Sequence, residues 1–346
     1  MAETNRLVPK GCAALVDLGV PDFTSWPPRC RQFIFPVETS SYREGIPRVN
    51  SLPITKAHGT GNDFVLVEDL DGHLEIDADL VRQLCDRNFG VGADGLIRLA
   101  PADEDAAAFF MDYRNSDGSI AEMCGNGIRC STKYLIDRGL LTSSHDRARR
   151  RVGVQTRSGV RQVTYELGGD DLVSTVEVDM GPPSFEPASV PLAPDFAESL
   201  QVPFESIHAG ERLRLNAVSM GNPHAVVFGP DPVGIDVASV GREIEKSAIF
   251  PEGANVEFVE VVSSSHLKMR VWERGVGETL ACGSGACAAF AAARELEMVG
   301  DSVTLSLPGG ELRLRWDGTI MMAGPAVEVF DAVVNLDTLG APTYHR

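Results

Sequence analysis

The sequence predicts two copies of one unit built from strands and helices. Three short motifs recur in the same order along the 346 residues. The pairs, each given by its first residue, are "GNDFVLV" at Gly61 with "GNPHAVV" at Gly221, "FGVGADG" at Phe89 with "FPEGANV" at Phe250, and "CGNG" at Cys124 with "CGSG" at Cys282. The second members follow the first by 160, 161 and 158 residues. This nearly constant offset predicts two equivalent halves about a pseudo-twofold axis, with the two cysteines on opposite sides of a shared cleft.

Short elements alternate from Leu52 onward, as such a unit requires. Apolar runs predict a strand at 63–70 and another in "AAFFMDYRN" at 107–115, and an amphipathic pattern predicts a helix at 77–87. A helix is expected at 125–139, opened by glycine and closed by Gly139, and two strands at 303–316 flank a Pro-Gly-Gly turn. Residues 1–51 contain several prolines and no sustained period, so they are interpreted as an N-terminal extension, with disorder as one alternative.

Composition excludes several classes of function. The chain is 43% apolar, enough for two ordinary domains. It carries 31 basic and 49 acidic residues, and this net charge of −18 argues against a nucleic-acid partner. The one basic run, "RARRR" at 147–151, is interpreted as a solvated loop. No apolar run approaches the roughly 18 residues of a membrane span, and no signal pattern opens the chain, so a cytoplasmic protein is expected.

The seven cysteines do not form the pattern of a disulfide framework, because their number is odd and the chain is long. Two close pairs, Cys124 with Cys130 and Cys282 with Cys287, have five and four intervening residues and no adjacent histidine. Zinc sites favour two to four residues within each pair, so no metal site is predicted. Cys85, Cys130 and Cys287 are interpreted as core residues, and Cys12 and Cys30 in the extension have no assigned role.

Cys124 and Cys282 each stand at the expected first turn of a helix. Unpaired backbone N–H groups and the helix dipole favour a thiolate there and lower its pKa, and the flanking glycines let a carboxylate approach the same N–H groups. If one thiolate removes a proton from a carbon and the opposite thiol delivers one to the other face, the stereocentre inverts. Each cysteine alone is more simply a small buried residue, but the duplication favours the chemical interpretation.

The chain from Leu52 to Phe330 resembles the diaminopimelate epimerase family. The resemblance is carried, in the family's order, by "HGTGNDFVLV", "NSDGSIAEMCGNGIRC", "MGNPHAVV", "PEGANVEFV", "ERGVGETLACGSGACA" and "GPAVEV". It implies an α+β fold of two pseudo-symmetric domains, each with mixed strands around a central helix, and an active site in the cleft between them. The first domain is expected at 52–168 plus 327–346 and the second at 169–326.

The same resemblance implies an activity. The expected reaction is epimerisation of LL-2,6-diaminopimelate to meso-diaminopimelate by two-cysteine 1,1-proton transfer, in lysine and cell-wall precursor biosynthesis. The family uses neither metal nor pyridoxal phosphate, so no cofactor is expected. The family suggests a homodimer, and the expected partner is the small-molecule substrate.

Site residues follow position by position from the resemblance. Cys124 and Cys282 match the two catalytic acid/bases. Glu273 is expected near the substrate's α-amino group, and Arg274 is expected to pair with its far carboxylate, which a guanidinium binds in bidentate fashion. His224 is expected in a supporting role near a catalytic cysteine. The other expected substrate-binding residues are Asn62, Asn115, Gly125, Asn126, Asn222, Asn255, Gly283 and Ser284.

Structural alternatives remain for four of these residues. Asn62 and Asn222 follow glycines and have the character of turn residues, although their recurrence in the repeat favours ligand contacts. Arg274 has a surface ion pair as its alternative, and His224 a satisfied core position. The chain also departs from the family pattern at Gly95, where many members have glutamine, and at Thr60, where many have an apolar residue.

Two rival functions stay open. Proline and hydroxyproline racemases also use paired cysteines, but they typically have histidine where Asn126 stands and Asp-Arg-Ser-Pro before the second Cys-Gly, where this chain has "VGETLACGSG". The other rival is a non-catalytic protein that holds an amino acid between its halves. Such a protein would need the helix ends but not both thiols.

Overall fold

The computed structural model describes residues 50–141 and 150–339. The predicted extension, with Cys12 and Cys30, and most of the basic run at 147–151 lie outside these residues. Within the described ranges, no helix combines the length and the apolar character needed to cross a bilayer.

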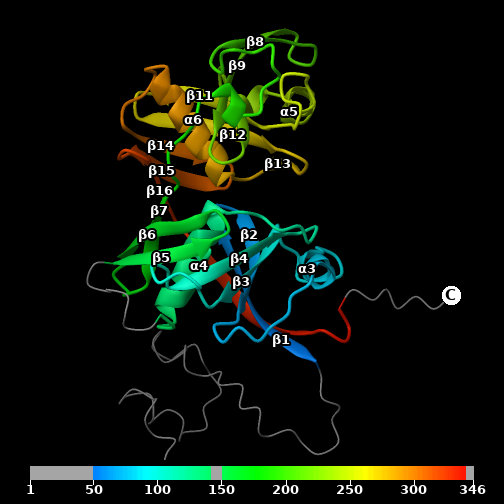
Figure 1. Ribbon diagram of the computed structural model, residues 1–346, viewed down its shortest axis with the longest axis vertical. Helices are drawn as coiled ribbons and strands as arrows, with labels where there is room; N and C mark the ends of the chain where they lie inside the picture. The colour runs from blue at the N-terminus through cyan, green and yellow to red at the C-terminus, as the bar shows by residue number, and fades with distance from the viewer. Residues whose placement is uncertain (1–49, 142–149, 340–346) are drawn as a thin grey trace, which may run out of the picture. The chain divides into compact units, whose positions relative to one another are not determined.

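The first repeat is a curved sheet around one helix (Figure 1). Its strands are β1 (Ser51–Gly59), β2 (Asn62–Glu68), β3 (Gly95–Ala100), β4 (Phe109–Asn115), β5 (Arg151–Thr156), β6 (Gly159–Leu167) and β7 (Val173–Asp179). Each pairs with the next; β2–β3 and β4–β5 are parallel and the others antiparallel. The strand β17 (Val327–Asn335) joins this sheet antiparallel to β1.

The second repeat has the same sequence of pairings. Its strands are β8 (Val202–Ser206), β9 (Glu211–Ser219), β10 (Pro223–Phe228), β11 (Asn255–Ser263), β12 (His266–Glu273), β14 (Ser302–Leu307), β15 (Gly310–Trp316) and β16 (Ile320–Gly324). β10–β11 and β12–β14 are parallel, and the other neighbouring pairs are antiparallel. β8 thus pairs with β9 as β17 pairs with β1, and the short β13 (Gly277–Thr279) folds back on β12.

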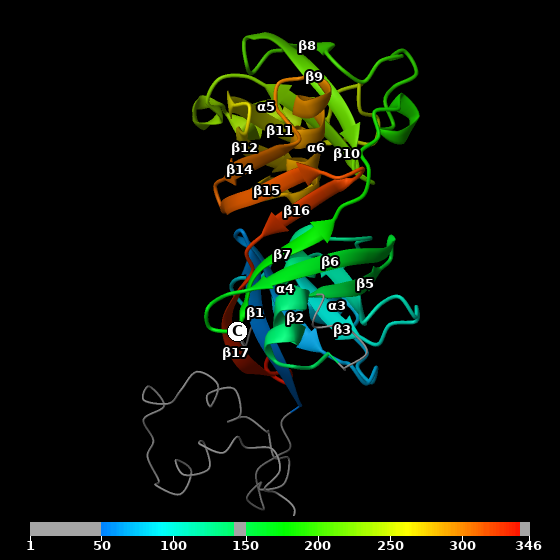
Figure 2. The ribbon, with the colours of Figure 1, turned by 90° about the vertical axis from the view of Figure 1, so that its left-hand side faces the viewer.

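The two repeats are joined edge to edge. β7 and β16 pair antiparallel, with Val176 opposite Gly324 and Asp179 opposite Met321, and Figure 2 shows these two strands lying side by side. β7 is the last strand in the sheet of the first repeat, and β16 is the last strand in that of the second. Equivalent strands therefore pair with each other, as the pseudo-twofold relation between the motifs requires.

Four α-helices occur in the described residues, two in each repeat. α4 (Gly125–Asp137) packs against β1 to β4, β7 and β17, and α6 (Gly283–Glu295) packs against β9 to β12, β15 and β16. Both belong to one apolar core that runs through both repeats. α3 (Ala78–Cys85) and α5 (Val237–Glu245) cover smaller cores on the opposite faces of their sheets. Short 3₁₀ turns lie at Pro187–Ser189 and Pro232–Gly234.

The sequence patterns account for these elements. Asp77 caps α3 by accepting a hydrogen bond from the Leu80 N–H, as its position before the helix predicts. The helix ends at Cys85, earlier than expected, because the Asp86 side chain accepts from the N–H groups of Asn88 and Phe89 and turns the chain. The expected α+β fold of two pseudo-symmetric halves, each with mixed strands around a central helix, is confirmed.

Candidate active site

Cys124 and Cys282 are the N-cap residues of the two central helices. The Cys124 Sγ accepts a hydrogen bond from the Gly127 N–H at 3.4 Å, and the Cys282 Sγ accepts one from the Gly285 N–H, also at 3.4 Å. Cys124 is half-buried and Cys282 is buried. Each thiol therefore takes the place that a serine or aspartate oxygen takes in an ordinary helix cap.

The first turns of α4 and α6 converge on one methionine. An added Cβ would lie 2.6 Å from the Met322 Cε at Gly125 and 3.2 Å from it at Gly283. The Gly283 position is also 3.4 Å from the Asn126 Oδ1, which reaches across from the other helix. A side chain at Gly125 would displace this methyl group, and one at Gly283 would require only a small shift of it. Two sets of free N–H groups thus face one region, which suits a carboxylate.

Burial changes the expected acidity of the thiols. Burial raises the pKa of Cys124 to about 11, although the Gly127 N–H acts in the opposite direction. Burial also raises the pKa of Cys282 well above its usual value, and the nearby carboxylates of Glu273 and Glu257 add to the effect. The expected lowering of pKa by the helix start is therefore present but smaller than the desolvation cost. The raised pKa values favour the thiol form of both groups in the substrate-free protein.

On the first repeat, Asn62 links three groups of the site. Its Oδ1 accepts a hydrogen bond from the Asn126 Nδ2 at 3.1 Å and lies 3.9 Å from the Cys124 Sγ. Its Nδ2 donates to the Asp94 Oδ2 at 2.9 Å. Asn115, at the end of β4, donates instead to the Ser119 Oγ at 3.0 Å, and no hydrogen bond among the described residues joins it to the other expected site residues.

On the second repeat, Asn222 occupies the matching place. Its Nδ2 donates to the Ser284 Oγ at 3.4 Å, and that hydroxyl lies 3.5 Å from the Cys282 Sγ. Its Oδ1 lies 3.0 Å from the Nε2 of His224, whose Nδ1 lies 2.7 Å from the Glu257 carboxylate. His224 is thus both fully buried and connected to the site, so its core and supporting interpretations hold together.

Glu273 and Arg274 follow one another at the end of β12. The Thr279 hydroxyl donates to the Glu273 carboxylate at 2.5 Å, and burial raises the pKa of Glu273. The Asn255 Oδ1 accepts from the Arg274 N–H at 2.9 Å. The Arg274 side chain is exposed and donates to the Glu252 carbonyl. Within residues 50–141 and 150–339, Arg274 has no carboxylate at ion-pair distance, so its guanidinium is available to a ligand.

Asp94 and Glu257 were missed in the sequence. Asp94 is the counterpart of Asn255 in the repeated "GAD" and "GAN" motifs, which is the signal that identifies it. The neighbouring departure, Gly95, has a steric reason. A Cβ there would lie 2.5 Å from the Arg114 carbonyl oxygen and 2.6 Å from the Tyr113 ring.

Comparison with known proteins agrees with this arrangement. A family model described as diaminopimelate epimerase matches residues 54–186 and 216–329. A diaminopimelate epimerase of Xanthomonas euvesicatoria pv. vesicatoria (strain 85-10) is 45% identical over 292 residues, covering 83% of this chain and 98% of the relative. One of Desulfitobacterium hafniense (strain DSM 10664 / DCB-2) is 42% identical over 297 residues, covering 83% and 100%.

Solved structures show the same fold at low identity. A probable proline racemase from Agrobacterium radiobacter K84, with bound carbonate, matches with a TM-score of 0.64 and 15% identity over 83% of this chain and 93% of that chain. A hydroxyproline epimerase from Agrobacterium vitis, with bound trans-4-OH-L-proline, matches with a TM-score of 0.62 and 16% identity over 84% and 93%. Fold is shared with these proteins, whereas sequence is shared with the first group. The chain belongs to the diaminopimelate epimerase family.

Proposed function

We propose that this chain interconverts LL-2,6-diaminopimelate and meso-diaminopimelate by 1,1-proton transfer between Cys124 and Cys282. The observation that carries the proposal is the pair of N-cap thiols on two converging helix starts. One cysteine, as thiolate, takes the α-proton and becomes a thiol. The opposite thiol gives its proton to the other face of the carbanion and becomes a thiolate. One C–H bond breaks and one forms, so no oxidant or reductant is consumed.

The reacting carboxylate is assigned to the two helix starts. Backbone N–H groups at Gly125, Asn126, Gly283 and Ser284 are fixed donors, and they stabilise negative charge that spreads from the carbanion onto the carboxylate. The bound substrate also excludes water from the space between the two thiols, and each thiol then lies beside the proton that it exchanges. The cost of forming a buried thiolate, visible in the raised pKa of Cys124, is then offset by these donors.

The rest of the substrate is assigned to polar groups on both repeats. Arg274 is assigned to the far carboxylate. Its exposed guanidinium, which lacks an acidic partner among the described residues, supports this assignment. Glu273 is assigned to the α-ammonium group, whose charge a neighbouring carboxylate complements. The remaining binding roles are assigned to Asn62, Asn115, Asn222 and Asn255, with His224 in support of Asn222.

Proton NMR in D₂O tests the activity directly. Purified, reduced protein without added cofactor is incubated with meso-diaminopimelate, and the α-proton signal is expected to disappear as the LL isomer forms. Cys124→Ala and Cys282→Ala should each abolish this exchange, whereas the control Cys85→Ala should retain it. Exchange with proline alone would assign the chain to proline racemases. If the wild-type protein binds the substrate without exchanging its α-proton, and the two cysteine variants bind it equally well, the chain would be a binding protein.

Three further features of the family are also proposed for this chain. We assign residues 52–168 plus 327–346 to the first domain and residues 169–326 to the second. The proposed pathway is lysine and cell-wall precursor biosynthesis. A reducing compartment, the cytoplasm, is proposed because the reaction needs two free thiols, and cell fractionation checks it.

A homodimer is proposed from one exposed apolar surface. Val327, Val329, Phe330 and Val333 on β17 are 43–59% exposed. β17 pairs only with β1 among the described strands, so its other edge is open to a second copy. Light scattering should give twice the chain's 37.2 kDa, and a monomer mass would contradict the proposal.

A further inference from the structure

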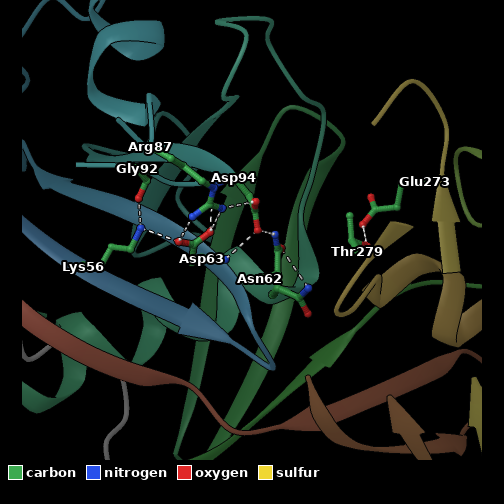
Figure 3. Close-up of polar contacts among 9 residues, drawn as sticks. Lys56, Asn62, Asp63, Arg87, Gly92, Asp94, Glu273 and Thr279 are labelled. Carbon is green, nitrogen blue, oxygen red and sulfur yellow. Dashed lines mark hydrogen bonds and ion pairs between the residues drawn. The ribbon is translucent and has the colours of Figure 1, made fainter. Parts of the chain in front are cut away.

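Four charged side chains form a connected network beside Asn62 (Figure 3). The Asp63 carboxylate accepts from the Lys56 Nζ at 2.6 Å and from the Arg87 Nη2 at 2.8 Å. Arg87 also donates to the Asp94 Oδ1 at 2.8 Å. Lys56 is nearly buried and is held further by the Gly92 carbonyl. The network therefore runs from the interior of the first repeat to the polar groups of the site.

Asp94 is fixed through both of its oxygens. Oδ1 is held by Arg87, and Oδ2 accepts from the Asp63 N–H at 3.1 Å as well as from Asn62. The Asp63 carboxylate in turn accepts from the Asp94 N–H at 3.1 Å, so each aspartate holds the other's backbone. Although burial opposes ionisation, hydrogen bonds from Arg87 and Lys56 hold the pKa of Asp63 far below its usual range. Asp94 thus has little freedom to rotate away from Asn62.

The chemistry of a carboxylate then determines how Asn62 is oriented. An ionised carboxylate only accepts hydrogen bonds, whereas an amide offers a donor on one side and an acceptor on the other. Asn62 must turn its Nδ2 toward Asp94, which leaves its Oδ1 facing Asn126 and Cys124. We propose that Asp94, held by Arg87 and Asp63, is a positioning residue that fixes the Asn62 amide with its carbonyl oxygen toward the Cys124 thiol.

This orientation affects which form of Cys124 is favoured. The Asn62 oxygen accepts a hydrogen bond from an S–H group at 3.9 Å and offers nothing to a thiolate. A reversed amide would instead donate to a thiolate, and it would also set its NH₂ group against that of Asn126. The fixed amide therefore supports Cys124 as a proton donor.

The second repeat has no carboxylate at this position, and its asparagine, Asn222, is oriented by His224 instead. Asn255 replaces Asp94 there, and its Nδ2 donates to the Pro223 carbonyl at 3.0 Å rather than to Asn222. Cys282 has the Ser284 hydroxyl close by, and a hydroxyl adapts to either a thiol or a thiolate. The two acid/bases are thus set in different hydrogen-bonding surroundings despite the repeat.

Asp94→Asn tests the inference, because an amide at this position pairs with either orientation of Asn62. The alkylation rates of Cys124 and Cys282 by iodoacetamide are measured from pH 7 to 11 in one sample, resolved by peptide mass spectrometry. The Cys124 profile should move to lower pH, giving about a tenfold faster reaction at fixed pH for each unit of pKa change. Cys282 should not move. The charged groups with the largest effects on the pKa of Cys124, which are Glu273 and Arg129, are the same in both proteins.

Two controls keep the result interpretable. Asp79→Asn removes another carboxylate from an exposed position beside Arg82 and should leave both profiles unchanged. Arg87→Gln loosens Asp94 without altering Asn62, so it should give a smaller shift in the same direction and replaces Asp94→Asn if that variant does not fold. An unmoved Cys124 profile, or equal movement of both cysteines, would overturn the inference.

The inference rests on the proposed function only in taking Cys124 as an acid/base. Alkylation needs no substrate, so a failure of the positioning role is distinct from a failure to epimerise diaminopimelate. In the epimerisation assay, Asp94→Asn should lower kcat by about tenfold while KM changes less, as expected for loss of an interaction that matters during proton transfer.

Discussion

At the residue scale, His224 and Glu257 show how a repeat acquires a function in one copy only. By the motif offsets their counterparts in the first repeat are the apolar residues Phe64 and Leu96. Both His224 and Glu257 are fully buried, and the Glu257 Oε2 has no hydrogen-bond partner among the described residues. The pair orients Asn222 so that its amide donates to Ser284. Burying the pair costs desolvation free energy, and the orientation of Asn222 depends on it.

Replacing one member of this pair should be far more damaging than replacing both. His224→Phe leaves a buried carboxylate without its partner and should lower the free energy of unfolding by about 3–5 kcal/mol. Adding Glu257→Leu removes that carboxylate, restores the pairing of the first repeat and should recover at least half of the loss. Urea unfolding of the two variants measures this. A double variant no more stable than His224→Phe would contradict the argument.

The same contrast shows what the sequence could and could not predict at this scale. The recurrence of the motifs led to the prediction of the two cysteines and of Asn62 and Asn222, whereas the other asparagines were predicted from the family resemblance. Asp94 and Glu257 were missed because each occurs in one copy only and contacts the site through another residue. The pKa of Cys124 was predicted with the wrong sign, since a sequence shows the helix start but not how deeply the thiol is buried.

At the element scale, the turn between β14 and β15 supports the start of β2. Gly309 in this turn donates its N–H to the Leu280 carbonyl at 3.0 Å, two residues before Cys282. It also packs against Thr60, which with Gly61 forms a turn with positive φ values of 52° and 84° just before Asn62. The second repeat therefore touches the first beside the site. The Pro-Gly-Gly turn was predicted from the sequence, but this contact was not, because it joins segments about 250 residues apart.

Gly309→Ala should displace this turn. A Cβ at Gly309 would overlap the Thr60 carbonyl oxygen, a backbone atom that cannot rotate aside, so the Thr60–Gly61 turn and Asn62 must move. A shift of about 1 Å in a binding group should lower kcat/KM by tenfold to a hundredfold. Gly169→Ala is the matched control, because an added Cβ there meets nothing within 4 Å. Equal kcat/KM in the two variants would show that this contact does not position the site.

At the scale of the whole molecule, the fold is one series of strand pairings used twice. The sequence predicted this because the motifs mark the same strand ends and helix starts in both copies. It did not predict the β7–β16 pairing, since edge pairing depends on backbone groups that no side-chain pattern records. The join is also where the apolar core becomes continuous through both helices. Four cysteines lie in or beside that core, and Cys85 is buried in the separate core beneath α3.

Those thiols should make the folded chain sensitive to alkaline pH. Burial raises the pKa of Cys85 and of Cys130 to about 12 and that of Cys124 to about 11, against 9.0 for an ordinary thiol. The folded chain then holds protons that the unfolded chain releases, so this contribution to stability is complete below pH 9 and is lost as the pH rises toward 12. Each thiol should lower the free energy of unfolding by about 1.4 kcal/mol per pH unit in this range.

Cys85→Ala separates the contribution of one buried thiol to the pH dependence of stability from the contributions of tyrosines and lysines, which titrate in the same pH range. Cys85 lies in the core beneath α3, away from the paired helix starts, so its removal leaves the other buried thiols in place. Urea unfolding in the presence of reductant, at half-unit steps from pH 8 to pH 11, should give a shallower decline for the variant, by about 1.4 kcal/mol per pH unit once the pH is above 9. Parallel curves for the two proteins would mean that Cys85 is no harder to ionise in the folded chain than in the unfolded one.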